Sequence, residues 1–192
     1  MKMNKMVLGI ISVVVVIGIL FGTTYNGLVS KEADVDAQWA NVESKLQRRY
    51  DLIPNLVNSV KGSMKQEKEV FGNIADARAK MAGAKGPEEV SEASGELEGA
   101  LSRLLVVMEN YPELKSNENV QTLMTQLEGT ENRISVERDR YNEAVKSYNV
   151  AIRKFPKSIF ASIGGFDKKE FFEADKGAEK APDVNFDDED DE

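Results

Sequence analysis

An uncharged apolar run near the N-terminus constrains this chain more than any other feature of its sequence. The run extends from Met6 to Thr24 and reads MVLGIISVVVVIGILFGTT. At 1.5 Å per residue it spans about 28 Å, close to the hydrocarbon thickness of a bilayer. Lys2 and Lys5 precede the run, and Tyr25 follows it at the depth where interfacial tyrosines lie. We therefore expect a transmembrane helix over residues 6–25, with the lipid bilayer as its partner.

Two alternatives to an uncleaved anchor fit the sequence less well. A secretory signal peptide needs small residues around a cleavage site, and the segment GTTYNG after the run offers no Ala-x-Ala pattern. A lipoprotein signal needs a cysteine, which the chain lacks. A buried core helix would have a polar face, and none is present between Val7 and Gly22. We predict a single-pass membrane protein in which residues 1–5 form a short segment before the anchor.

The charges that flank the anchor predict its orientation. Lys2 and Lys5 lie before it, whereas Lys31 is the only basic residue between Tyr25 and Val42. By the positive-inside rule, the N-terminus then lies in the cytoplasm and the rest of the chain lies outside the cell membrane.

Beyond the anchor, apolar residues recur at helical spacing. One row steps by sevens through Trp39, Leu46, Ile53 and Val60. Similar rows continue over residues 90–111 and 120–155, and no strand-like alternation appears. The expected fold class is all-α: the transmembrane helix followed by an antiparallel up-and-down helical bundle over residues 26–156.

The number of bundle helices depends on one break. The apolar phase continues through Pro54 and Gly62, which favours one helix from about Ser30 to Met81 and a three-helix bundle. That helix would be about 78 Å long, against roughly 37 and 58 Å for the other two. A break near Gly62-Ser63 gives segments of more similar length. Four helices are therefore favoured and three are possible.

Composition excludes several classes of function. The chain has no Cys and no His, so neither a Ser-His-Asp nor a Cys-His nucleophile can form, and a zinc site would need carboxylates alone. We predict no enzyme activity, no metal site and no cofactor. The net charge of −8 lies entirely in residues 173–192, and the remainder holds 23 acidic and 23 basic residues. A neutral body with an acidic end argues against nucleic-acid binding. Residues 175–192 are expected to be a disordered acidic tail.

One basic residue falls on an apolar row, where a lone charge is costly. Arg49 occupies this position, and Glu131 and Glu137 fall on the rows of the last long segment. We predict a buried polar layer that joins Arg49 to one of the two glutamates and fixes the register of the helices. A binding site and a solvated helix face are the alternatives. Pro54 follows in the same segment and predicts a helix kink.

The C-terminal part holds a repeated pair and a phenylalanine-rich segment. The pair is Tyr141-Asn142 and Tyr148-Asn149, one heptad apart, which places the tyrosines in the core and the asparagines where they can bridge helices. Residues 157–174 form a Phe-rich segment that cannot be one helix. It either docks on the end of the bundle or contacts a membrane or a partner. The candidate interaction residues are Phe155, just before this segment, and Phe160, Phe166, Phe171 and Phe172 within it.

Several short motifs occur in a fixed order along the chain. They are Tyr25–Val29 (YNGLV), Leu46–Val57 (LQRRYDLIPNLV), Tyr111–Lys115 (YPELK), Thr130–Ile134 (TENRI) and Phe155-Pro156. Their order and spacing, together with the anchor, resemble the bacterial LemA family from about Met1 to Phe186. The resemblance implies a single-pass membrane protein with a helical-bundle domain, and it implies no catalytic mechanism. One departure is Val120, where the family usually has an aromatic residue.

Three hypotheses for function follow. The first is a non-enzymatic, membrane-anchored scaffold of the cell envelope that binds an unidentified protein partner. The second is a membrane-shaping homo-oligomer that touches the bilayer through Phe155–Phe172. The third is an enzyme that uses carboxylates and tyrosine, for which the sequence shows no converging set of groups.

Overall fold

In the computed structural model, which describes residues 5–173, the protein is all-helical, and this part of the chain contains no strand. The predicted acidic tail at 175–192 and most of the segment 1–5 lie outside the described residues. The elements in chain order are α1 (Lys5–Val60), α2 (Lys68–Gly83), α3 (Gly86–Met108), α4 (Pro112–Lys115), α5 (Glu118–Arg153) and α6 (Lys157–Gly164).

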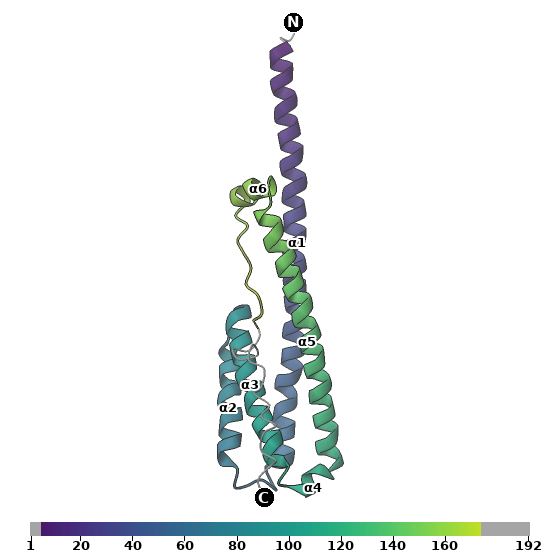
Figure 1. Cartoon of the computed structure of the whole chain (residues 1–192), viewed down its shortest axis with the longest axis vertical. Helices are drawn as coiled ribbons and strands as arrows, with labels where there is room; N and C mark the ends of the chain where they lie inside the picture. Colours follow the sequence, from purple (N-terminus) through teal and green to yellow (C-terminus); the bar gives the residue numbers. More distant parts are fainter. Residues whose placement is uncertain (1–4, 174–192) are drawn as a thin grey trace, which may run out of the picture.

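Helix α1 is continuous from the apolar run into the rest of the molecule (Figure 1). It has 56 residues and is therefore about 84 Å long. Its first part contains the only described helix segment that is long and apolar enough to cross a membrane, and none of that segment is buried by the protein. The helix does not end after Tyr25, where the predicted transmembrane segment ends, and it continues through Pro54. The kink at Pro54 stays a prediction.

Three helix ends carry local signals that explain them. Helix α1 ends at Val60, and the turn that follows contains Gly62-Ser63, where the buried Met64 packs into the core. Helix α3 has Pro in its first turn and acidic residues beside it, as the helix dipole favours. Helix α5 is capped by Asn117, whose side chain accepts hydrogen bonds from the N–H groups of Asn119 and Val120.

The long helices form a bundle in two layers. Helices α1 and α5 lie against each other and run in opposite directions, while α2 and α3 form a hairpin beside them (Figure 1). The buried residues form two hydrophobic clusters. One lies near the membrane anchor and includes Val42, Leu46 and Tyr148. The other lies at the far end and includes Ile53, Leu97 and Leu127.

The chain returns towards the anchor in α5 and then reverses. Short α6 packs against α1 and α5 at the membrane end of the bundle (Figure 1). Gly165 follows in the left-handed conformation, with φ of 73°, which glycine adopts without steric cost. Residues 166–173, here called the C-terminal strap, then run without regular structure back along α5 towards the α2–α3 hairpin.

Candidate functional site

Two asparagines of α5 hold the C-terminal strap by its main chain. Asn149 Nδ2 donates to Lys169 O at 2.8 Å, and Lys169 N–H donates to Asn149 Oδ1 at 2.9 Å. Asn142 makes the same pair of bonds with Phe172, both at 2.9 Å. Each amide therefore satisfies both main-chain groups of one strap residue.

The spacing of these two pairs follows from elementary geometry. Seven residues on a helix advance about 10.5 Å. Three residues of extended chain advance roughly 10 Å. Asn142 and Asn149, seven apart on α5, therefore match Phe172 and Lys169, three apart on a strap that runs the opposite way.

Further donors bind the same segment by its carbonyl oxygens. Tyr141 Oη donates to Glu170 O at 2.8 Å. The carbonyl of Glu173 accepts from Arg138 of α5 at 3.0 Å and from Ser91 of α3 at 2.7 Å. The strap thus joins α5 to the α2–α3 hairpin through bonds that do not depend on its own side chains.

One strap side chain is part of the core. Phe172 is buried, and its ring lies 6.2 Å from that of Trp39, which in turn lies 5.2 Å from Tyr141. The guanidinium of Arg138 lies 4.4 Å from the centre of the Phe172 ring and forms a cation–π contact with it.

A second strap side chain forms ion pairs with α1. Lys169 Nζ lies 2.9 Å from Glu32 Oε1 and 3.6 Å from Asp36 Oδ1. The hydrogen bond to Glu32 raises the pKa of Lys169, and the nearby charge of Asp36 adds to the effect.

The two tyrosines of the Tyr-Asn repeat are buried, but only one hydroxyl is paired. Burial raises the pKa of Tyr141 to about 12. Burial also raises the pKa of Tyr148, and the charge of Glu32 adds to the rise. Tyr148 Oη has no hydrogen-bond partner among the described residues, unlike Tyr141 Oη.

Arg49 and Glu131 meet between α1 and α5. Arg49 is 1% exposed, its Nη1 lies 2.9 Å from Glu131 Oε2, and its other amino group donates to Ser94 of α3. Glu137 lies elsewhere and pairs with Arg140 on its own helix at 2.9 Å. The structure therefore brings two of the three predicted polar residues together and adds Ser94. The register role of this layer stays a proposal.

The layer lies at the boundary between the two hydrophobic clusters. Along α1, Arg49 falls between Leu46 of the membrane-side cluster and Ile53 of the far cluster. The same boundary passes between Val90 and Leu97 on α3 and between Leu127 and Ile134 on α5. Ser94 and Glu131 lie in those intervals.

The five candidate phenylalanines fall into three environments. Phe172 is in the core, as described above. Phe160 and Phe166 pack on α1, with rings 5.6 Å from Phe21 and 5.4 Å from Tyr25. Phe155 is 81% exposed and Phe171 is 37% exposed.

A groove of about 880 Å³ opens between α1, α5 and the strap. Its polar lining includes four lysines, Lys31, Lys146, Lys154 and Lys157, with Glu143 as its acidic residue. Val150, Pro156 and Phe171 contribute apolar surface. Within residues 5–173, no group of three or more acidic, Cys or His side chains could hold a metal ion.

Sequence reasoning identified the Tyr-Asn repeat but assigned its asparagines to the wrong partner. We expected them to bridge helices, whereas they bind the main chain of an extended segment. The heptad repeat of Asn was the available signal. The lysines of the groove gave no signal, because Lys31 and Lys154 are far apart in sequence.

Comparison with known proteins identifies relatives over most of the chain. The sequence model of the LemA family matches residues 38–186. Magnetosome proteins MamQ 1 and MamQ 2 of Paramagnetospirillum magneticum are each 32% identical over 88% of this chain and 71% of theirs. Magnetosome protein MamQ of Magnetospirillum gryphiswaldense is 31% identical over 77% of this chain and 64% of its own length.

Proposed function

The chain belongs to the LemA family, and from this premise we propose that it is a membrane-anchored scaffold that acts without catalysis. The long apolar helix fits a single-pass membrane protein. We propose that the domain beyond the anchor is an up-and-down bundle of four long helices that presents a rigid surface to a protein partner.

The continuity of α1 carries the proposal. A scaffold must hold its partner at a fixed place, and a helix that runs unbroken from the anchor into the bundle provides such a connection. Beyond Tyr25 the helix extends by roughly 50 Å to Val60. The Arg49–Glu131 layer, proposed to fix the register of α1 and α5, supports the same role.

An exposed apolar pair at the far end offers a contact surface. Leu105 and Val106 of α3 are 37% and 66% exposed. Their position near the end of α3 lies far from the anchor (Figure 1). Contiguous exposed apolar surface is typical of interaction sites, whereas apolar residues exposed singly need no explanation.

Photocrosslinking tests the scaffold. A photoreactive amino acid at the exposed Ser102 should form a defined protein adduct in intact cells, and Leu105→Glu with Val106→Glu should abolish it. The same amino acid at Glu128, exposed on α5, is the control. Absence of any protein adduct at position 102 would contradict a partner at this surface.

We propose that the N-terminus is cytoplasmic and that the bundle lies on the opposite, non-cytoplasmic side of the cell membrane. A tag placed after Glu192 should be cleaved by protease added to intact cells. Cleavage only after lysis would place the bundle in the cytoplasm and overturn the argument from Lys2 and Lys5.

A second candidate function is a membrane-shaping oligomer. One observation favours it: Phe160 and Phe166 pack on Phe21 and Tyr25, so α6 lies level with the end of the apolar run. Vesicles that carry the full chain would change curvature under this hypothesis and stay unchanged under the first.

A further inference from the structure

We infer that α6 and the lysines beside it form a docking surface for anionic phospholipid headgroups. The inference rests on the proposed membrane-anchored arrangement and deepens it by naming the class of lipid. The depth of α6, its outer face and the charges around it support this inference.

The depth of α6 follows from its contacts with the anchor helix. Phe160 packs against Phe21, which belongs to the apolar run, and Phe166 packs against Tyr25, directly after the run. Gly164 allows this close packing, because a Cβ there would lie 2.8 Å from the Phe166 ring. A helix held at this level lies at the boundary between hydrocarbon and headgroups.

The outer face of α6 is apolar although the protein leaves it uncovered. Phe155, Ile159 and Ile163 are 81%, 51% and 70% exposed. Ile159 and Ile163 are four residues apart in α6 and therefore lie on one side of the helix. Phe155 lies in the turn just before α6. The inner face carries Ala161, which is buried. A short helix with one apolar face in water and the other on protein is suited to lie in a membrane interface.

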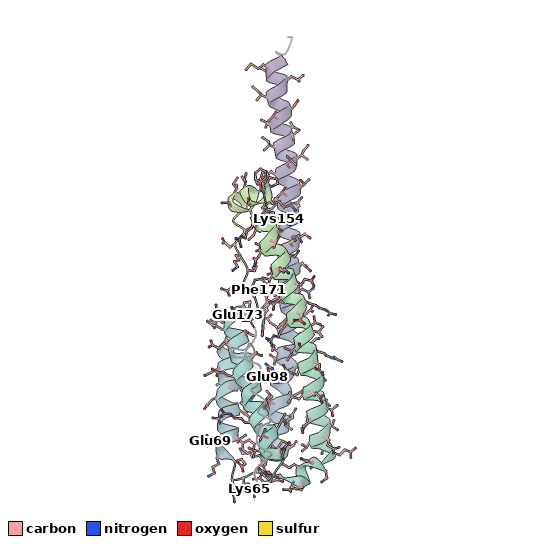
Figure 2. All side chains as sticks on the ribbon, viewed as in Figure 1. Lys65, Glu69, Glu98, Lys154, Phe171 and Glu173 are labelled. Carbon is pink, nitrogen blue, oxygen red and sulfur yellow. The ribbon has the colours of Figure 1, made fainter. Side chains whose placement is uncertain are left out.

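Lysines surround this apolar face. Lys154 and Lys157 flank Phe155 and Pro156, and Lys31 lies across the groove on α1. Figure 2 shows Lys154 at the membrane end of α5, with Phe171 farther along the strap. None of these three lysines forms an ion pair with a described residue. Lys31 instead donates to Ser147 at 2.7 Å.

The positions of these lysines match the headgroup layer. Lys31 lies about 10 Å along α1 beyond Thr24, and lysine side chains reach several ångströms back towards an interface. Lys154 and Lys157 adjoin α6 itself. The acidic groups near these lysines are Glu143 in the groove, Asp167 after α6 and Glu32 beside Lys31. Glu32 is already paired with Lys169. Lysines at a membrane surface attract anionic lipids, whereas a zwitterionic surface gives them no such gain.

The chain lends itself to a direct test because it contains no cysteine. Ile159→Cys in the full-length protein carries a spin label on the outer face of α6, and Ser102→Cys carries the same label on α3. Both proteins are placed in nanodiscs of phosphatidylcholine alone or with phosphatidylglycerol. The ratio of oxygen to nickel-chelate collision rates then reports the depth of each label.

We expect the label at 159 to be immersed in phosphatidylglycerol nanodiscs and the label at 102 to stay in water. Lys154→Glu with Lys157→Glu should remove most of the immersion at 159. Lys65→Glu with Lys68→Glu reverses two lysines at the same spacing, exposed at the far end of the bundle, and should leave it unchanged.

Two results would overturn the inference. A label at 159 that is as accessible to the nickel chelate as that at 102 excludes membrane docking of α6. Equal immersion in both lipid compositions, unaffected by charge reversal, excludes the anionic headgroup as the ligand. Failure of the anchor itself is distinguishable, because the protein would then not co-purify with the nanodiscs in either composition.

Discussion

Asn142 and Asn149 lie one heptad apart on α5, and each binds both main-chain groups of one strap residue. This arrangement recognises an extended chain by its backbone and its length rather than by its side chains. It places the strap between α5 and the α2–α3 hairpin, and it should contribute measurably to the stability of the bundle.

Replacing either asparagine with alanine should lower the free energy of unfolding by about 1–3 kcal/mol, because strap groups lose their partners. Asn41→Ala on the exposed face of α1 should change it by less than about 0.5 kcal/mol. Denaturation of the full chain in detergent can be followed by Trp39, the only tryptophan, which packs against Phe172. Equal effects of all three substitutions would contradict the role assigned to the strap.

The Arg49–Glu131 pair should respond asymmetrically to single substitutions. Glu131→Met leaves the guanidinium of Arg49 buried without a carboxylate partner, and should cost about 3 kcal/mol or more. Arg49→Met should cost less, because the Glu131 side chain is 34% exposed and can be hydrated. The double variant should recover stability relative to Glu131→Met alone.

A double-mutant cycle measures this coupling, and Glu128→Gln on the exposed face of α5 is the control. Strictly additive single effects would show that no coupled layer exists between α1 and α5.

The two buried tyrosines should respond differently to loss of the hydroxyl. Tyr141→Phe removes the donor to Glu170 O and should cost about 1 kcal/mol. Tyr148→Phe removes a buried hydroxyl that has no described partner, so stability should be unchanged or higher. Because both changes are the same and both sites lie on α5, thermal melts of the pair form a matched comparison. A larger loss at Tyr148 would contradict the assignment.

Stability should fall as the pH rises above 10. The pKa of Tyr141 is raised by burial from 10.0 to about 12, so the unfolded chain loses this proton first and the folded state is progressively disfavoured between these values. The loss is on the order of 2 kcal/mol. Lys169, whose pKa is raised by Glu32, acts in the same direction, because its ion pairs are lost at high pH.

Urea denaturation at pH 8, 10 and 11.5 measures this slope, and Tyr141→Phe should flatten it. A variant with an unchanged slope would show that another group controls the alkaline transition.

The family and the all-helical class were predictable from the sequence and are confirmed. The row through Leu46, Ile53 and Val60 is buried in the core, as its period indicates. The spacing of apolar residues along a helix indicates which of its faces is buried, even when the helix that packs against that face is not known. Arg49 stands out in the sequence for the same reason, since it interrupts such a row.

Two features could not be predicted from the spacing of apolar residues. Asn26-Gly27 is a pair typical of turns, yet α1 runs through it, and Leu28 directly after it is buried near α6. Tertiary packing therefore overrides a local preference there. The strap has no period at all, and its position depends on a match of lengths between two segments that the sequence separates by 20 and 30 residues.

Because α1 is continuous, the orientation of the anchor in the bilayer determines the orientation of the bundle. Transmembrane helices tilt by about 20° on average. Because α1 continues as one helix through Tyr25, a tilt of the anchor is carried into the bundle. Over roughly 50 Å of helix beyond the bilayer, such a tilt displaces the far end sideways by about 17 Å. A change in bilayer thickness, which alters tilt, is thereby converted into a swing of Val106 and its neighbours across the membrane surface.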